Sequence, residues 1–126
     1  MALNEGQYTG EFLEAEAPGK ISRDQVVVTV PGATTYVDGQ VLGKIAASGK
    51  YVAYDETATD GRETAAGVLY GNLENDAVSA ADFDGVIVNW SAEVDSADLE
   101  WGGADETAGT ADLAALGIKV RTNGNA

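Results

Sequence analysis

Residues 25–30, which read QVVVTV, decide the fold class of this chain. Val26, Val28 and Val30 share one face of an extended chain, because successive side chains of a strand point to opposite sides. The β-branched content favours a strand, and Pro31-Gly32 ends it. The sequence therefore predicts a β-strand with one apolar face, followed directly by a turn.

The same rhythm continues along the chain. Further strands are predicted at residues 41–45, 51–54, 64–73 and 83–90, because each run is rich in apolar residues and bounded by Gly, Pro, Asp or Ser. The turn signals between them recur about every 8 to 12 residues, which is typical of antiparallel β-structure. The sequence thus indicates a small barrel-like or sandwich-like domain.

The end of the chain has a different period. Alanines recur at helical spacing over residues 104–115, and Gly117 is a stop signal. Gly109 weakens the first half of this helix by about 1 kcal/mol relative to Ala, so the expected helix begins after Thr110. Residues 118–121 then alternate like a final strand. The predicted fold class is mainly β with one short C-terminal helix.

The chain divides into three segments of different composition. Residues 1–23 are polar and acidic and are predicted to form an extended N-terminal arm, residues 24–121 a single β-rich domain, and residues 122–126 a frayed tail. Phe12-Leu13 is an apolar pair within the arm. From composition alone, the arm is either an idle tail or a docking strand that anchors this pair on a partner.

The charge balance narrows the class of partner. The 126 residues include 21 acidic and 7 basic ones, for a formal net charge of -14. Nucleic acids and anionic membranes are therefore unfavourable partners, since both are bound through clustered Lys and Arg. The start of the chain lacks a basic and apolar leader, and no apolar run approaches the roughly 18 residues of a membrane span. We expect a soluble protein that is not exported.

The chain lacks the residue types that enzymes use most often. The chain contains no His and no Cys, which removes the commonest general base, the thiolate nucleophile and the usual transition-metal ligands. Residues 43–50 resemble a phosphate-binding loop, but the glycine spacing is too long and Tyr51 stands where Ser or Thr is needed; we interpret them as a hairpin turn. No enzyme activity, metal or cofactor is predicted, although a small carboxylate-pair hydrolase stays formally open.

Two acidic stretches of the sequence have to be considered as calcium-binding loops. Residues 55–61 and 82–85 carry closely spaced carboxylates, but neither has the alternating oxygen ligands and closing Glu of an EF-hand loop. We interpret both as solvated acidic turns.

The two tryptophans allow two functional interpretations. Trp90 and Trp101 are candidates for the core or for a trimer interface, which is the more common place for such aromatic residues. With exposed tyrosines they would alternatively form the platform of a carbohydrate-binding β module, displayed on a virion.

The order of several short segments resembles the head decoration proteins of lambda-like tailed bacteriophages. The specificity lies in order and spacing, and the resemblance covers roughly residues 10–121. The segments that carry it are residues 41–44, 48–55, 59–61, 65–69, 93–94, 99–101 and 113–121.

This resemblance implies a structural protein of the virion. The fold would be a small β-tulip type, and three copies would form a homotrimer at the three-fold and quasi-three-fold sites of the expanded capsid. Such a cement protein is made in the bacterial host cytoplasm and stabilises the outer surface of the capsid against the pressure of packaged DNA. The partner would be the major capsid protein, to which residues 11–21, with Phe12, Leu13 and Ile21, would add a strand.

Overall fold

The computed structural model describes residues 13–16, 23–90 and 92–121, with side chains in the last two ranges only. The arm residues Phe12 and Ile21 and the tail at 122–126 lie outside the described residues. In chain order the elements are β1 (Leu13–Glu16), β2 (Arg23–Val30), β3 (Thr34–Tyr36), β4 (Val41–Lys44), β5 (Tyr51–Ala53), β6 (Ala65–Tyr70), β7 (Leu73–Asn75), β8 (Ala81–Val88), β9 (Ala92–Asp95), the 3-10 turn η1 (Ser96–Asp98), α1 (Glu106–Ala115) and β10 (Ile118–Arg121).

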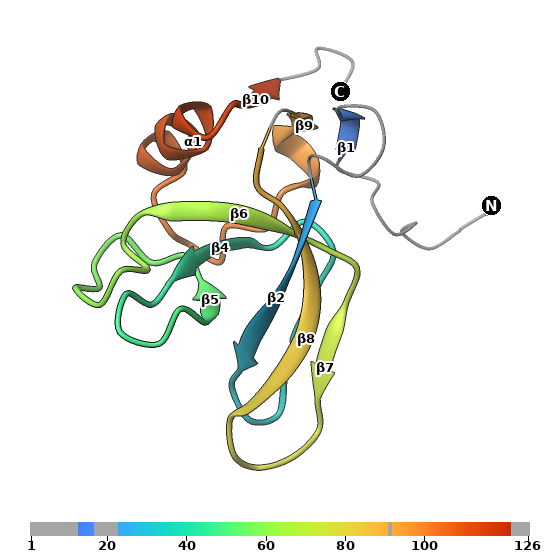
Figure 1. Ribbon diagram of the computed structural model, residues 1–126, viewed down its shortest axis with the longest axis vertical. Helices are drawn as coiled ribbons and strands as arrows, with labels where there is room; N and C mark the ends of the chain where they lie inside the picture. The colour runs from blue at the N-terminus through green and yellow to red at the C-terminus, as the bar shows by residue number, and fades with distance from the viewer. Residues whose placement is uncertain (1–12, 17–22, 91, 122–126) are drawn as a thin grey trace, which may run out of the picture.

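Five strands form a closed barrel in the order β2-β5-β4-β6-β8 (Figure 1). β2 and β8 pair antiparallel along their full length, and β4 pairs antiparallel with both β5 and β6. The barrel closes between β2 and β5 through one parallel pair, Val28 opposite Tyr51. The predicted fold class is confirmed: the protein is mainly β, with a barrel and one helix near the C-terminus.

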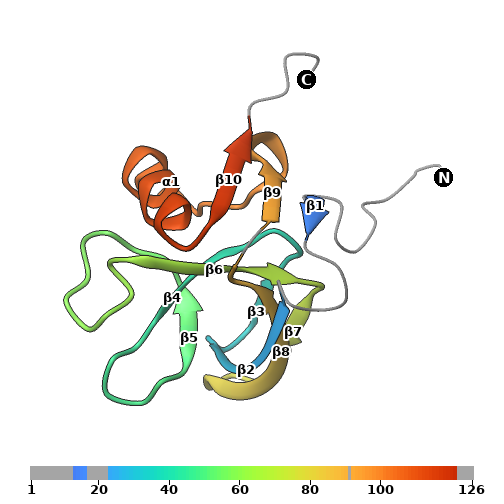
Figure 2. The ribbon, with the colours of Figure 1, turned by 45° about the horizontal axis from the view of Figure 1, so that its top comes forward.

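Two smaller sheets flank the barrel. In one, β9 pairs antiparallel with β1 on one side and parallel with β10 on the other. In the other, β3 pairs antiparallel with β7. Figure 2 shows that α1, β9 and β10 lie together on the side of the barrel formed by β6. Residues 92–121 are therefore a cover over one face of the barrel.

The packing separates into two hydrophobic cores. We call the apolar interior of the barrel the interior core, and the layer between the barrel and its C-terminal cover the outer core. Because side chains alternate along a strand, adjacent residues of β4, β6 and β8 enter different cores. Val41, Val68 and Val88 belong to the outer core, whereas Leu42, Leu69 and Ile87 belong to the interior core.

The helix α1 begins earlier than the sequence pattern predicts. Asp105 is its N-cap, with a side chain that accepts hydrogen bonds from the backbone N–H groups of the first turn. The expected start after Thr110 is therefore wrong, because this cap and the packing of the helix outweigh the low helix propensity of Gly109. Gly117, with φ of 88°, follows the helix as predicted.

Gly109 has a packing role inside the helix. A Cβ atom at this position would lie 2.3 Å from Cζ3 of Trp101 and 3.0 Å from Cε2 of Tyr54. The rings of Trp101 and Tyr54 meet edge to face, with centroids 6.0 Å apart. The absence of a side chain at Gly109 thus lets α1 approach the aromatic pair beneath it.

Three strand boundaries also differ from the prediction. The strand expected at residues 64–73 is divided by Gly71, which has a φ of 99° and turns the chain from β6 into β7. β3, at residues 34–36, is not among the predicted strands. Residues 82–85, interpreted as an acidic turn, lie inside β8, because Phe83 packs against the interior core while its acidic neighbours point outward.

Replacing Gly109 by Ala is expected to destabilise the protein although Ala is the better helix former. Helix propensity favours the variant by about 1 kcal/mol, but the contact with Trp101 is overpacked, which typically costs about 1–3 kcal/mol. We expect a net loss of up to about 2 kcal/mol in the free energy of unfolding, measured by urea denaturation. Thr107→Ala, on an exposed turn of the same helix, is the control and should change stability by less than about 0.5 kcal/mol. Stabilisation by Gly109→Ala would contradict the packing role.

Candidate functional site

The described carboxylates serve the fold and do not assemble a metal centre. Within residues 23–90 and 92–121, no three acidic side chains are placed to hold a metal ion. Asp38 and Asp112 instead accept backbone N–H groups, from Gly71 at 2.6 Å and from Ala65 at 2.9 Å. These carboxylates join segments that are distant in the sequence, so their role is structural.

The segment that resembles a phosphate loop is a hairpin turn, as predicted. It connects β4 to β5, with the N–H of Ile45 donating to the carbonyl of Lys50 at 2.8 Å. Gly49 has a φ of 76°, and the chain enters a strand where a phosphate loop needs a helix N-terminus. The backbone amides are therefore not aligned for an anion.

In the acidic loop at residues 55–61, the carboxylates of Asp55 and Asp60 accept hydrogen bonds from residues next to them in the chain. Asp55 accepts the N–H and hydroxyl of Thr57, which lowers the pKa of Asp55. Arg62 donates to Asp60 through two nitrogen atoms and lowers the pKa of that carboxyl. These hydrogen bonds occupy the carboxylates of Asp55 and Asp60. The segment is therefore described well by an acidic turn.

The structure places the two candidate tryptophans in different environments. Trp101 is 7 % exposed and belongs to the outer core. Trp90, two residues after β8, is 53 % exposed. Trp101 therefore contributes to packing, whereas about half of the Trp90 side chain is accessible to solvent.

The candidate arm residue Leu13 opens β1. Its backbone lies opposite Val94 of β9, and the register shifts between Leu13 and Ala15. β1 is an edge strand of the β1-β9-β10 sheet. The arm, which the sequence predicts to be extended, thus contains a short strand that pairs with β9 of the folded domain.

The turn between β7 and β8 carries an exposed apolar side chain, and its backbone is held by hydrogen bonds from a buried side chain. Val78 is 96 % exposed. The buried amide of Asn75 supports this turn by donating to the carbonyls of Val30, at 2.9 Å, and Ser79, at 3.0 Å. The turn lies at the end of the molecule opposite β1 (Figure 1).

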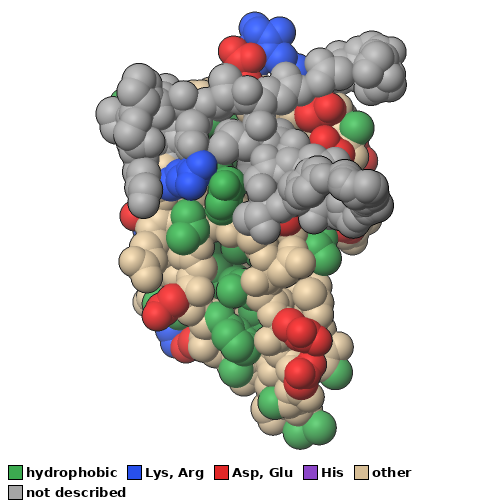
Figure 3. Space-filling view, turned by 90° about the vertical axis from the view of Figure 1, so that its right-hand side faces the viewer, with side chains coloured by type: hydrophobic (Ala, Val, Ile, Leu, Met, Phe, Trp, Pro, Cys, Tyr) green, Lys and Arg blue, Asp and Glu red, His purple; other side chains and the backbone are tan. Residues whose placement is uncertain are grey.

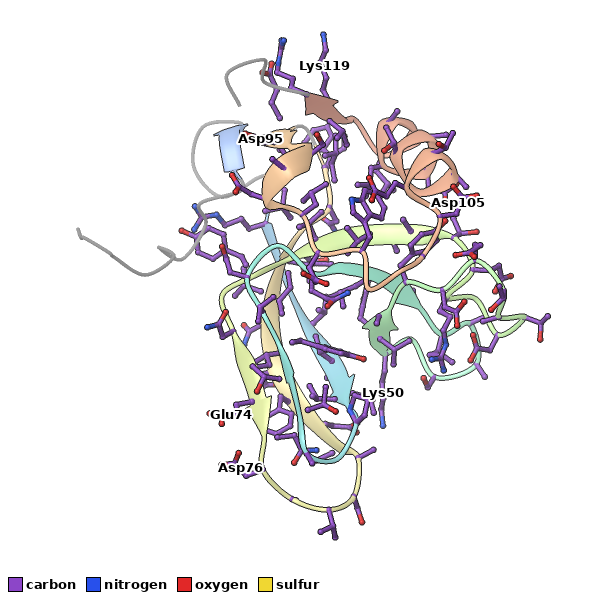
Figure 4. The ribbon with its side chains drawn as sticks, turned by 180° about the vertical axis from the view of Figure 1, so that it is seen from behind. Lys50, Glu74, Asp76, Asp95, Asp105 and Lys119 are labelled. Atoms are coloured by element: carbon purple, nitrogen blue, oxygen red, sulfur yellow. The ribbon has the colours of Figure 1, made fainter. Side chains whose placement is uncertain are left out.

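Exposed charges interact mainly along neighbouring strands. Lys50 donates to Asp82 at 2.6 Å, and the hydroxyl of Thr29 donates to the same carboxylate at 2.7 Å. Both hydrogen bonds lower the pKa of Asp82. The carboxyls of Glu74, on β7, and Asp76, directly after β7, lie beside one another (Figure 4), and the hydrogen bond between them raises the pKa of Glu74.

Sequence reasoning missed a hollow beside β2. Its volume is about 480 Å³, and it lies between residues 24–27 of β2 and the turn that leads into β5. Val27, 37 % exposed, lines it. The alternation in residues 25–30 does predict that Val27 points away from the barrel interior, but the local pattern contains no signal for how the neighbouring strand diverges.

The family comparison identifies the class of protein. The family model described as bacteriophage lambda head decoration protein D matches residues 2–118. The chain belongs to this family. A comparison with curated proteins finds no match.

Membership of the decoration protein family gives the chain a structural role on a phage head and implies that it binds a phage capsid. A structural family of this kind agrees with a chain that lacks His and Cys. Among the described residues, no helix combines the length and the apolar character that crossing a membrane requires.

Replacing Lys50 by Gln is expected to raise the pKa of Asp82 toward its ordinary value. The folded-state pKa of Asp82 is depressed, so the stabilisation is present above the unfolded value of about 3.9 and is lost as the pH falls through the folded value. Carboxyl chemical shifts followed by NMR between about pH 2 and 7 measure the change. Lys119→Gln, on β10, is the matched control; an unchanged pKa of Asp82 in Lys50→Gln would refute the assignment.

Proposed function

We propose that the chain binds as a homotrimer to the outer surface of the expanded capsid of a tailed phage, at three-fold and quasi-three-fold sites, and stabilises the shell against the pressure of packaged DNA. The family match over residues 2–118 carries this proposal. The protein would be made in the host cytoplasm and act as a cement on the assembled virion, with the major capsid protein as partner.

The physical basis of cementing is multivalency. A trimer that bridges several capsid subunits keeps its other contacts when one contact breaks, and the broken contact re-forms at high effective concentration. If its binding site is complete only on the expanded shell, binding stabilises that state by mass action. Neither effect needs a catalytic group.

The charge of the chain limits where the contacts between subunits can lie. Three copies carry a formal charge of 3 × -14, or -42. Repulsion of this size favours an arrangement in which carboxylates face solvent and the contacts are formed by uncharged surface. Figure 3 shows such a surface, where apolar side chains form a central stripe with acidic groups at its sides.

We assign capsid docking to the arm, residues 1–23, and the trimer-forming fold to residues 24–121. The observation that supports this division is the position of β1. As an edge strand, it offers unpaired backbone groups to an added strand, which is the mode of β-augmentation. Phe12, Leu13 and Ile21 would supply the side-chain anchors.

Co-sedimentation with expanded capsids tests the docking role. The full-length variant Phe12→Asp/Leu13→Asp should lose capsid binding at least about tenfold, which corresponds to about 1.4 kcal/mol, while light scattering still gives a mass near three chains. Val78→Asp places a new charge on the opposite end of the molecule and is the matched control. Unchanged binding by the arm variant would refute arm docking, and a monomeric mass would refute the trimer.

Carbohydrate binding is the second candidate, and the exposed ring of Trp90 favours it. Aromatic rings in sugar-binding proteins stack on the apolar face of a sugar, which needs an accessible ring. A glycan array with the unmodified protein and Trp90→Ala tests this function. Binding that disappears in Trp90→Ala would support it, whereas an array without signal would eliminate it.

A further inference from the structure

Asp-Gly pairs occur in the sequence at residues 38–39, 60–61 and 84–85. Such a pair is chemically labile in water, because glycine has no side chain to shield the nitrogen atom that attacks the aspartate carboxyl. Asp38 is 3 % exposed, and Gly85 lies inside β8, opposite Val26. Asp60 lies in the loop between β5 and β6 with a side chain that is 42 % exposed. The pair at residues 60–61 therefore combines a loop backbone with a carboxylate that is open to solvent.

The reaction of an Asp-Gly pair needs no reagent besides water. The backbone nitrogen of Gly61 would attack Cγ of Asp60, lose its proton and expel water from the protonated carboxyl, which closes a cyclic imide. Water then opens the imide at either of its carbonyl carbons and gives aspartate or isoaspartate. In isoaspartate the main chain runs through the former side chain. The product has the same mass as the original chain, and its backbone is longer by one methylene group.

The fold requires glycine at position 61. A Cβ atom there would lie 2.3 Å from the carbonyl oxygen of Lys44 and 2.7 Å from the nitrogen of Ala46. Both atoms belong to the backbone of the hairpin between β4 and β5, and the φ of Gly61 is 116°. A larger residue after Asp60 would slow the closure of the imide, but the packing against this hairpin excludes it.

The peptide unit between Asp60 and Gly61 is held at both of its polar ends. The N–H of Gly61 donates to Oε1 of Glu63 at 2.7 Å. The carbonyl of Asp60 accepts the N–H of Ala46 at 2.9 Å. Closure of the imide has to bring the nitrogen of Gly61 to bonding distance of Cγ and remove its proton. Both movements break the hydrogen bond to Glu63, so this bond opposes the reaction.

The carboxyl of Asp60 is held by Arg62. The guanidinium donates to Oδ1 at 3.2 Å and to Oδ2 at 3.0 Å, and the backbone N–H of Arg62 donates to Oδ1 at 3.3 Å. The side-chain hydrogen bond from Arg62 lowers the pKa of Asp60. Because the carboxyl loses water only from its protonated form, a lower pKa leaves less of the reactive species at any pH above it.

We propose that Asp60-Gly61 is a latent site of isoaspartate formation, which Arg62 and Glu63 keep unreacted in the folded protein. Arg62 holds the carboxyl that would be attacked, and Glu63 holds the nitrogen that would attack it. The loop lies directly on β4, since a Cβ atom on Gly43 would lie 2.5 Å from Cα of Arg62. An added backbone methylene would therefore separate the loop from the barrel. This inference concerns the single chain and is independent of the proposed trimer.

The unmodified protein gives the first test. The full-length chain and a synthetic peptide of residues 57–66 are incubated at about pH 5, roughly one unit above the ordinary pKa of aspartate. Isoaspartate is measured by chymotryptic mapping with electron-transfer fragmentation, which separates the two isomers. We expect residue 60 to react at least about tenfold more slowly in the folded chain than in the peptide. Equal rates would overturn the protection.

Substitution of the two holding residues gives the second test. Arg62→Gln and Glu63→Ala should each raise the rate of isoaspartate formation at residue 60 at least about threefold. Arg121→Gln, which removes an arginine from the exposed ion pair with Glu93, is the matched control and should leave the rate unchanged. A rate unchanged in both loop variants would overturn the inference, and a slower reaction in Glu63→Ala would overturn the protective role of Glu63.

The other Asp-Gly pairs are internal controls for the state of the fold. In each loop variant, isoaspartate should increase at residue 60 and not at Asp38 or Asp84. An equal increase at all three positions would attribute the reaction to general unfolding and would overturn the local protection by Arg62 and Glu63. Urea denaturation of each variant, before incubation, measures its stability independently.

Discussion

The rest of the structure depends on one constraint: β4, β6 and β8 are buried on both faces where residues 41–42, 68–69 and 87–88 lie between the two cores. These strands separate the interior core from the outer core, so neither of their faces tolerates an unsatisfied polar side chain. Gly43 lies so close to Arg62 that a Cβ would meet the backbone of that residue at 2.5 Å. Without α1, β9 and β10, the outward valines of the barrel would be exposed. The C-terminal cover is therefore part of the folding unit.

One polar group is buried in the outer core at a cost in free energy. Trp101 Nε1 is buried and has no hydrogen-bond partner among the described residues, which costs about 1–3 kcal/mol. The large apolar area of the indole, its edge contact with Tyr54 and the close approach of α1 at Gly109 offset this cost. The indole thus packs against both the helix, at Gly109, and Tyr54 in the outer core.

A barrel with short edge strands suits a protein whose role is to bind a partner surface and not to catalyse a reaction. Its carboxylates are used for caps, turns and exposed ion pairs, each of which contributes little by itself. The backbone edges of β1 and β2 are different in kind, because they offer hydrogen bonds to any extended segment of suitable charge.

The sequence by itself determined the β class, the helix near residue 110, the turns at Gly49 and Gly117 and the absence of His and Cys chemistry, because these follow from local periodicity, from turn residues and from composition. Tertiary structure alone decided that Trp101 is buried while Trp90 is exposed, that β1 pairs with β9, and that β2 pairs with β5 only at Val28. Each of these depends on which distant segment packs alongside, and a local pattern contains no information about that neighbour.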